Sequence, residues 1–402
     1  STVSMTSADR IEVLTGPLAQ LYGNSAGGVI QTFTREAGDK PVVESQVYLG
    51  SYGMARTDWQ FSQRTGNVGV VADYSTFAIH GYRDNSDARR QQLNTVVTVD
   101  AKPDTRIKLI ANIFDMPYAK DALGLTASQY ATNPSQAGNY AIANGAQKIV
   151  KQEQVGAVFD HKINNELRFQ ARLYSGTRDN LQYQASSATA GTWVGLARQF
   201  GGIGIQVQGK ARMSGDKALD WIIGHDRDSS GEQRQGGSAA NGLKTTTNRN
   251  ELNVASNRDY FAQANWHLIP NWTFITGVRQ SSVQLSSRDD YLTDGVDGSG
   301  SVTYKSTNPV IGATWHAFDT LNLYLNQGKG IETPTLSESA YSRSGSSIVG
   351  SFNPNLLASR SQHLEFGTKW TPAKFTRIDA AWFRIKTDNE IVTDLTVSGK
   401  SA

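Results

Sequence analysis

From about residue 42 onward, apolar and polar residues alternate along the chain in runs of about 8 to 12 residues. Side chains of a β-strand point to opposite faces with the same period of two residues. Each run is therefore expected to form a strand with one apolar face and one polar face. The run from 203 to 213 illustrates the pattern, with apolar or small residues at odd positions and mostly polar ones between them: Ile203, Ile205, Val207, Gly209, Ala211 and Met213 against Gln206, Gln208, Lys210 and Arg212.

The connections between these runs alternate in length along most of the chain. Short turns are predicted at residues 64–67, 102–105, 162–166, 214–217, 268–271, 316–320 and 371–374, and long polar loops at residues 117–148, 180–199, 226–253, 286–301 and 331–361. Tight turns at one end and long loops at the other are typical of outer-membrane barrels. The sequence thus predicts an all-β fold, a large antiparallel transmembrane β-barrel.

Tryptophan placement favours the same fold, because five of the eight Trp residues lie within a few residues of a predicted short turn: Trp221, Trp266, Trp272, Trp315 and Trp370. An aromatic girdle at a membrane interface has this arrangement, although Trp at the ends of a soluble core would also produce it. No run of about 18 apolar residues occurs, which excludes a transmembrane helix. The polar strand faces predict a wide lumen, and about 15 complete strands with the start of another predict a barrel larger than this chain.

Composition and motifs exclude several other classes of protein. The formal charge of +3 comes from 39 basic and 36 acidic residues spread along the chain, without the basic block that nucleic-acid binding requires. The Gly-x-Ser-x-Gly pattern at residues 23–27 lacks the strand and helix of a hydrolase nucleophile elbow. Two Asp clusters, at 226–228 and 289–297, offer oxygen ligands for calcium but lack EF-hand spacing. We therefore predict no catalytic residue, metal site or cofactor.

Two stretches resemble TonB-dependent outer-membrane receptors. The first resembles the end of their plug domain and has Gly16-Pro17, Leu21-Tyr22-Gly23 and Gly27-Gly28 in the family's spacing, although Thr15 replaces the usual Arg and Gln31 the common Asn. The second covers residues 330–338, 352–356 and 364–369 and resembles a late outer loop with its descending strand. Here residues 357–359 depart from the usual Lys-Pro-Glu.

The resemblance implies the end of a plug domain at residues 1–40 and an incomplete barrel at residues 41–402, with 15–16 strands of about 22. It also implies active uptake of a ferric siderophore or ferric citrate-like chelate across the outer membrane of a Gram-negative bacterium. The implied partners are the TonB–ExbB–ExbD complex, reached through a more N-terminal segment, and outer-membrane lipid and lipopolysaccharide. No cofactor is implied.

Arginine and aromatic side chains in the predicted outer loops are the best candidates for ligand contact, because iron chelates are usually anionic and guanidinium groups bind carboxylates bidentately. The candidates are Arg83, Arg89, Arg90, Arg178, Arg198, Tyr118, Tyr140 and Trp193, with Arg227, Arg234 and Arg249 in later loops. A passive porin and uptake of a non-iron nutrient such as cobalamin are alternative functions. A soluble all-β binding protein or carbohydrate-active enzyme is a further alternative, which a requirement for detergent would exclude.

Overall fold

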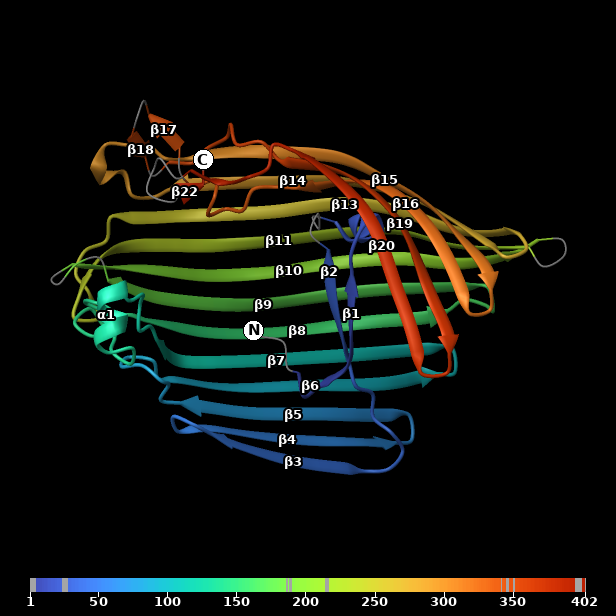
Figure 1. The fold of residues 1–402 in the computed structure, drawn as a ribbon, viewed down its shortest axis with the longest axis horizontal. Helices are drawn as coiled ribbons and strands as arrows, with labels where there is room; N and C mark the ends of the chain where they lie inside the picture. Colours follow the sequence, from blue (N-terminus) through green and yellow to red (C-terminus); the bar gives the residue numbers. More distant parts are fainter. Residues whose placement is uncertain are drawn as a thin grey trace.

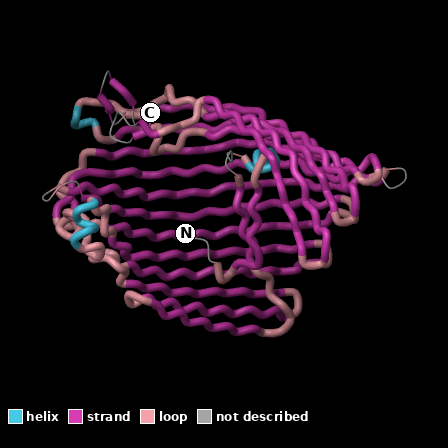
Figure 2. Tube along the Cα trace, in the orientation of Figure 1, coloured by secondary structure: helices cyan, strands magenta, loops and turns pink. Residues whose placement is uncertain are grey.

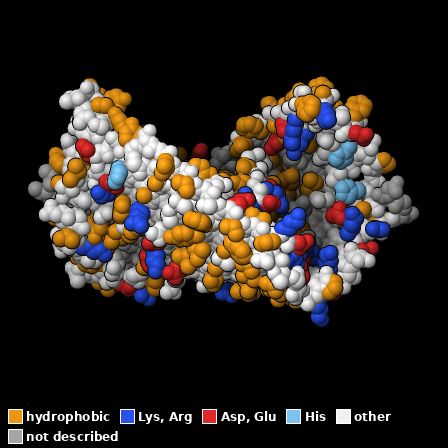
Figure 3. Space-filling model, turned by 90° about the horizontal axis from the view of Figure 1, so that it is seen from below, with side chains coloured by type: hydrophobic (Ala, Val, Ile, Leu, Met, Phe, Trp, Pro, Cys, Tyr) orange, Lys and Arg blue, Asp and Glu red, His pale blue; other side chains and the backbone are white. Residues whose placement is uncertain are grey.

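The fold is one large antiparallel sheet that curves around a hollow (Figures 1 and 3). The computed structural model describes residues 5–23, 28–185, 187, 190–213, 217–340, 342–344, 347–349, 351–394 and 400–401. Within these residues the sheet has 16 strands. Fifteen of them form a continuous antiparallel path from β3 at one edge to β20 at the other, and the short β12 pairs only with the end of β11. The strands are β3 (Val42–Gly50), β4 (Met54–Thr65), β5 (Val68–Ile79), β6 (Ala88–Lys102), β7 (Thr105–Lys120), β8 (Gln147–Lys162), β9 (Leu167–Ala185), β10 (Gly191–Arg212), β11 (Ala218–Ala240), β12 (Leu243–Lys244), β13 (Arg249–Ile269), β14 (Trp272–Asp289), β15 (Gly300–Phe318), β16 (Leu321–Glu332), β19 (Ser359–Ala373) and β20 (Thr376–Asp388).

Smaller elements lie inside the hollow and at its long-loop end. The hairpin of β1 (Ala8–Leu14) and β2 (Val29–Thr34), with the short helix η1 (Pro17–Tyr22), lies in front of the sheet in Figure 2. The long-loop end of the strands carries the other small elements. They are α1 (Ala127–Thr132), η2 (Leu292–Asp294) and two short hairpins, β17 (Ser342–Ser344) with β18 (Ser347–Val349) and β21 (Thr393–Asp394) with β22 (Lys400–Ser401). Among the described residues, none of the helices has the length and apolarity needed to cross a bilayer.

The two faces of the sheet have the alternation that the sequence predicts. Ile203 on β10, Ile223 on β11 and Ile311 on β15 lie on the convex face, and each is half exposed or more. The alternate positions of the same strands face the hollow and are mostly polar. Asp226 on β11 and Arg279 on β14 are buried examples. Such a continuous exposed apolar surface is unusual for a soluble protein, and it is the surface that a membrane barrel presents to lipid.

The predicted short turns are confirmed. Strand pairs β4–β5, β6–β7, β8–β9, β13–β14, β15–β16 and β19–β20 are joined at the predicted positions, on the right in Figure 1. The turn at 214–217 falls largely outside the described residues. Near this end of the convex face, the rings of Trp272 and Trp315 stack with centroids 6.0 Å apart, as expected for an aromatic girdle.

Two of the predicted long loops are wrong. Residues 180–199 and 226–253 were expected to be loops, but β9, β10, β11 and β13 extend through most of both segments and run for 19 to 23 residues. A bilayer needs only about 9 to 11 residues per strand. The rest of each strand would project beyond such a thickness. There polar and small residues occupy both faces, as in residues 229–240 of β11, so the alternation that marks a strand disappears. The loop at 117–148 is confirmed, but it contains α1, whose N-terminus is closed by a capping box between Thr126 and Gln129.

Apolar packing is concentrated at the long-loop end. Leu285, Tyr304 and Ile331 pack against Phe352 and Ala358 of the loop that follows β16, and the Tyr304 hydroxyl donates a hydrogen bond to the Leu356 carbonyl at 2.7 Å. Elsewhere many of the buried side chains are polar. The sheet is therefore held mainly by its backbone hydrogen bonds and by polar contacts across the hollow.

Gly209 provides a test of the packing on the convex face. A Cβ atom at Gly209 would collide with the indole of Trp221, its cross-strand partner. We expect Gly209→Ala to displace that indole and destabilise the protein by about 1 to 3 kcal/mol, read as a lower midpoint of thermal unfolding in detergent. Gly231 on β11 is the matched control, because its Cβ would meet nothing within 4 Å. Equal midpoints for Gly209→Ala and Gly231→Ala would contradict this packing.

Candidate functional site

Residues 5–23 and 28–40, here called the N-terminal segment, occupy the hollow and contact its concave wall. Helix η1 packs against β14, β15, β16 and β19. Figure 2 shows the β1–β2 hairpin crossing in front of the long strands of the sheet. The segment therefore lies within the hollow that the sheet encloses.

Glycines of the N-terminal segment allow its backbone to approach the wall. Gly16 has φ +75°, and a Cβ atom there would collide with the carboxylate of Glu365 on β19. Gly23 has φ +99°, and a Cβ atom there would lie 3.5 Å from the Arg279 guanidinium. Pro17 fits against Gly328, where an added Cβ would lie 3.0 Å from the proline ring. A larger residue at Gly16 would require the Glu365 carboxylate to move, and one at Gly328 would press on Pro17, whereas Gly23 is needed mainly for its positive φ.

The other residues on which the resemblance rests are not given a contact with the wall by the described part of the structure. Gly28 has φ +122°, and an added Cβ would lie 2.8 Å from the Leu14 carbonyl, so it allows the close pairing of β1 with β2. The Tyr22 side chain is half exposed. Gly27 lies outside the described residues, as does the side chain of Leu21.

The Glu365 carboxylate faces the segment without a basic partner in the described part of the chain. It accepts a hydrogen bond from the Tyr324 hydroxyl at 2.7 Å. Thr15, which precedes Gly16 and replaces the Arg that the resemblance would place there, carries no charge that could pair with this carboxylate. Contact here depends on the fit of Gly16 against the carboxylate.

Beside η1, the wall contains a buried ionic network. One amino group of Arg279, Nη2, lies 2.7 Å from an Asp259 oxygen and 3.1 Å from an Asp226 oxygen. Arg172 also pairs with Asp226, at 2.9 Å. The three central side chains are less than 10% exposed. Buried charges persist only with good partners, so this network holds strands β9, β11, β13 and β14 in one arrangement under the segment.

A cavity of about 300 Å³ opens in the wall next to this network. The Tyr174 hydroxyl donates to Asp228 at 2.6 Å, and the side-chain oxygen of Asn257 accepts from the Asp228 backbone N–H at 3.0 Å. Aromatic, apolar and polar groups together suit a small organic ligand. The lining includes Tyr174, Phe200, Asp228, Asn257, Asp259, Ser281, Val283 and Ile331.

Two of the predicted ligand residues lie together near this cavity. Arg178 on β9 and Arg198 on β10 are cross-strand partners facing the hollow, and Arg198 is two residues from Phe200. Arg178 donates to Gln152 at 2.6 Å, and Nε of Arg198 donates to Glu232 at 3.0 Å. Both lie on strands rather than in the predicted loops. Guanidinium groups held in this way remain available to an anion through their other N–H groups.

The other predicted ligand residues are dispersed. Arg83 donates to the backbone carbonyls of residues 122, 123 and 136 and so fixes the loop after β7. Arg89 lies opposite Tyr118 in the β6–β7 ladder, and Arg90 lies over the Phe77 ring at 5.1 Å. Tyr140 is exposed, with φ +73°. None of these lies beside Arg178 and Arg198 in the strand register.

Trp193 has little surface to offer a ligand, because only 2% of it is exposed. Its indole packs with Tyr183, Leu181 and Ala239 and donates to the Thr246 carbonyl at 2.9 Å. We therefore leave Trp193 out of the proposed ligand site.

The later arginines and the Asp clusters also occupy defined positions. Arg234 and Arg249 pair with Glu251 on the concave face, whereas Arg227 lies exposed on the convex face; all three are on strands, not in loops. Asp289 accepts from the backbone N–H groups of Tyr291 and Gly298. The described residues contain no group of three or more His, Cys, Asp or Glu that could hold a metal ion.

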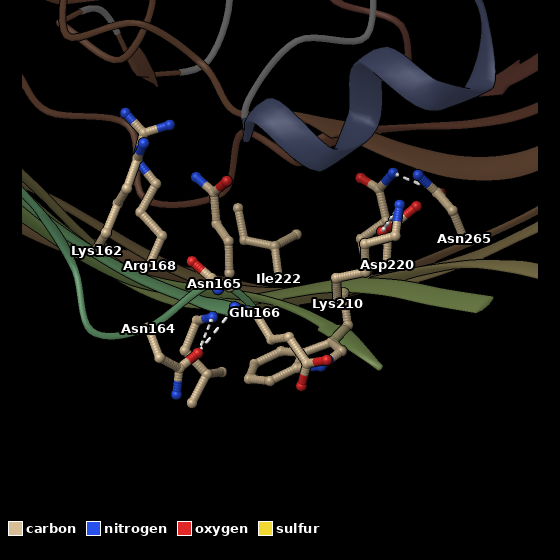
Figure 4. Close-up of a pocket in the computed structure, with 14 residues that line it drawn as sticks. Lys162, Asn164, Asn165, Glu166, Arg168, Lys210, Asp220, Ile222 and Asn265 are labelled. Atoms are coloured by element: carbon tan, nitrogen blue, oxygen red, sulfur yellow. Dashed lines mark hydrogen bonds and ion pairs between the residues drawn. The ribbon is translucent and has the colours of Figure 1, made fainter. Parts of the chain in front are cut away.

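A second cavity, of about 490 Å³, lies at the short-turn end of β8 to β13. Figure 4 shows Lys162, Arg168 and Asn265 on one side of the strands and Glu166 on the other. Lys210 and Asp220 pair across it at 3.6 Å. Its charged lining lies at the rim of the hollow opposite the long loops.

Glu36 links the N-terminal segment to the wall. Its carboxylate accepts from Lys108 at 3.1 Å and from Arg106 at 3.2 Å, both on β7. The hydrogen bond and the positive charge of Lys108, with the charge of Arg106, lower the pKa of Glu36. Arg35 adds a hydrogen bond to Gln60 on β4 at 2.9 Å.

Sequence reasoning identified Arg178 and Arg198 but missed Arg172, Arg279 and Asp259 as a network, and Tyr174 and Phe200 as cavity walls. All five side chains are at positions that the two-residue alternation places on the concave face. The alternation could have identified the face. It could not identify which of them meet, because that depends on the register of five strands.

Comparison with known proteins gives a consistent result. Residues 43–401 match the family model described as TonB dependent receptor-like, beta-barrel. Similar solved structures include the unliganded ferric citrate transporter FecA, with 16% identity over 96% of this chain and 62% of that one and a TM-score of 0.76. The ferric yersiniabactin uptake receptor FyuA from Yersinia pestis has 14% identity over 95% and 60%, with a TM-score of 0.77. The copper transporter OprC has 14% identity over 97% and 61%, with a TM-score of 0.75.

The present chain therefore spans less than two thirds of the length of these three proteins. Sequence identities of 14% to 16% show a shared fold, but they do not identify the ligand of this chain.

Gly16 allows a test of how the segment is held. We expect Gly16→Ala to expose the segment to trypsin after Arg10 or Arg35, because the new Cβ collides with Glu365. Gly295→Ala is the matched control, since Gly295 has φ +77° and open space around its Cβ position. Both substitutions carry the left-handed backbone cost of about 1 to 2 kcal/mol. Because the colliding oxygen ends a flexible side chain, the Glu365 carboxylate can turn away. The collision should therefore add about 0.5 to 1 kcal/mol and raise cleavage of the Gly16→Ala segment about two- to fivefold. Equal cleavage of the segment in both variants would mean that Gly16 has no special contact.

The contact between the Glu36 carboxylate and Lys108 is expected to depend on pH. Because its pKa is lowered, the contact with Lys108 is complete above the ordinary carboxyl value of 4.5 and is lost as pH falls further. The chain lacks Cys, so Gly38→Cys provides a single position for a spin label, two residues from Glu36. We expect the label to gain mobility only below about pH 4.5, and to be mobile at every pH when Glu36→Gln is added. A label whose mobility is unchanged down to about pH 3 would disprove the link.

Proposed function

The chain belongs to the TonB-dependent receptor family, and on that premise we propose that the whole protein takes up a nutrient actively across the outer membrane of a Gram-negative bacterium. This family consists of receptors and transporters rather than enzymes. The observation that most supports uptake is the N-terminal segment lodged in the hollow of the sheet against Glu365 and Arg279. A segment in this position would obstruct passive diffusion through the lumen, so it argues against a passive channel.

In this proposal residues 1–40 are the end of a plug domain and residues 41–402 are part of the barrel. The plug closes the lumen at rest, and energy to move it comes from the TonB–ExbB–ExbD complex. That complex would act on a part of the protein N-terminal to the segment. Glycine contacts at Gly16 and Gly23 and the Glu36 link are the points at which the segment must separate from the wall.

The convex face supports a position in a membrane. Its apolar residues and the Trp272–Trp315 stack would contact lipid and the lipid interface. The short turns would then face the periplasm and the long loops the exterior. Outer-membrane lipid is therefore a partner of this face.

We propose a ferric siderophore or ferric citrate-like chelate as the nutrient. Arg178 and Arg198 offer guanidinium groups to an anionic chelate, and Tyr174 and Phe200 wall the adjacent cavity. FecA and FyuA are described as carrying ferric citrate and ferric yersiniabactin. Arg83, Arg89, Arg90, Tyr118 and Tyr140 remain candidates for loop contacts with the chelate. Copper, named for OprC, and cobalamin are the other nutrients to test.

Uptake of radioactive iron by iron-limited cells that express the full-length gene tests this proposal. We expect one ferric chelate from a panel of siderophores and ferric citrate to be taken up, and uptake to vanish in cells that lack TonB. Uptake independent of TonB would instead favour a passive channel. Uptake of copper or cobalamin without iron would refute the iron assignment alone.

The same cells can test the ligand site. Arg178→Gln combined with Arg198→Gln should raise the chelate concentration for half-maximal uptake about tenfold or more, because charge-assisted hydrogen bonds contribute about 1.5 to 3 kcal/mol. Arg168→Gln, on the same strand but at the short-turn end, is the control and should leave that concentration unchanged. Identical curves for the double variant and the parent protein would exclude this pair from the site.

A further inference from the structure

Basic side chains follow one another along the concave faces of β9 and β10, two neighbouring strands that lie wholly within the described part of the chain. No acidic residue of either strand faces the hollow, because β10 contains none and Asp179 of β9 has a position on the convex face. Acidic residues face the hollow from the flanking strands β8 and β11 instead. We call the cations of β9 and β10 the basic track: Arg168, Arg172, Arg178, Arg198, Lys210 and Arg212.

Three carboxylate partners of the basic track are buried beneath their cations. The side chains of these acids are 5% to 11% exposed, whereas those of their arginine partners are 39% to 49% exposed. The surface that these pairs present to the hollow is therefore positive. The pairs are Arg168 with Asp160, Arg172 with Asp226, and Arg198 with Glu232.

Two cations stand directly opposite each other at each end of the track. At the outer end they are Arg178 and Arg198, the pair proposed above to contact the chelate. At the short-turn end they are Lys162 of β8 and Arg168 of β9. Like charges directly opposite on a sheet are destabilising, so an anion bound between Lys162 and Arg168 would remove that cost.

The cavity of about 490 Å³ at the short-turn end contains this second pair of cations. Lys210 also lines the cavity, and its side chain is 53% exposed. The side-chain oxygen of Asn265 accepts a hydrogen bond from Gln263 at 3.2 Å, which leaves the Asn265 amide nitrogen as a donor. Figure 4 shows Lys162, Arg168 and Asn265 on the same side of the strands. Ammonium, guanidinium and amide donors around one cavity suit the oxygens of a small anion.

The cavity has more basic than acidic groups on this side of the strands. Asp220 lies there and is shared between Lys210, at 3.6 Å, and His267, at 3.3 Å. Glu166 also lines the cavity, but it lies on the other side of the strands in Figure 4. Lys162, Arg168 and Lys210 thus exceed the single carboxylate that faces the hollow with them.

The cavity and the outer arginine pair lie at opposite ends of the same strand. Arg178 and Arg168 are ten residues apart along β9, with Arg172 between them. At about 3.3 Å per residue and a strand tilt of about 40°, this separation corresponds to about 25 Å along the membrane normal. A chelate held at Arg178 therefore does not reach the cavity. A chelate that moves along the track toward the short turns meets Arg172 and then the cavity.

We propose that the cavity of Lys162, Arg168 and Lys210 is a second binding site for the anionic chelate, here called the exit site, which the chelate occupies after it leaves Arg178 and Arg198. The basic track guides it from one site to the other. Asp220 competes with the bound anion for Lys210, which favours release at the short-turn end. The role in exit rests on the proposed uptake of an anionic chelate, whereas binding at the exit site can be measured without uptake.

Fluorescence quenching tests the exit site in the purified full-length protein, with ferric citrate as the anionic probe. Every variant carries a dye on Ile163→Cys, because Ile163 is 53% exposed, follows Lys162 and is not part of the cavity lining. Lys162→Gln with Lys210→Gln should raise the ferric citrate concentration for half-maximal quenching about tenfold or more, because two charge-assisted contacts are lost. The control, Lys102→Gln with Lys374→Gln, removes the same charge at other short turns and should change that concentration less than about twofold.

Equal half-maximal concentrations for these two double variants would overturn the exit site. Equal quenching by ferrioxamine B, a cationic ferric chelate, would overturn it as well, because charge would then play no part. Lys162→Arg with Lys210→Arg keeps both charges and should keep the half-maximal concentration within about threefold of the parent value. Circular dichroism and heat-modified gel mobility establish that each variant is folded.

Uptake by cells tests the role in exit separately. Lys162→Gln with Lys210→Gln should lower the maximal rate of chelate uptake about threefold or more and leave the concentration for half-maximal uptake unchanged, the reverse of the effect expected for the outer pair. An unchanged maximal rate would overturn the role in exit. If the parent protein takes up no iron chelate, the proposed nutrient is refuted, and the quenching result still decides whether the exit site binds an anion.

Discussion

Hydrogen bonding between neighbouring antiparallel strands is the constraint on which the rest of the structure depends. It fixes the register, and the register decides which face every side chain occupies. A slip of one residue along β11 would turn Asp226 toward the convex side and Arg227 into the hollow. The ionic network beside η1 would be lost. Membrane surface, hollow and segment contact are thus consequences of a single set of backbone pairings.

Sequence alone predicted much of this fold, because turn chemistry and the two-residue alternation are local properties. The turns after Thr65, Lys102 and Lys162 have the predicted positions. The prediction failed where β9 to β13 extend past the thickness of a membrane. There polar and small residues occupy both faces, and the last part of β11 has the composition of a loop. Helix α1 was missed because its six residues are too few to show a helical period.

The candidate site was less predictable, since its contacts join residues far apart in the chain. Arginine chemistry identified Arg178 and Arg198, but their pairing across β9 and β10 requires the register. Arg83 and Trp193 have the right chemistry, yet the structure uses them to hold loops. Arg279 looked like any other polar residue of an alternating strand, and only the fold brings it between Asp226 and Asp259. Residue type predicts what a side chain can bind, and topology decides what it meets.

The β1–β2 hairpin has a mechanical consequence. Its ladder runs from Ala8 opposite Thr34 to Leu14 opposite Val29, so the chain enters and leaves the hairpin at the same end. Suppose that the chain before Ala8 is pulled while the contact of Glu36 with β7 holds the other strand. The force would then act first on the pair at Ala8 and afterwards on each following pair of the ladder in turn. Hydrogen-bonded pairs that break one after another require far less force than pairs that must break at the same time. Under such a pull the hairpin would unzip rather than shear, and the segment would open in small steps under a modest load.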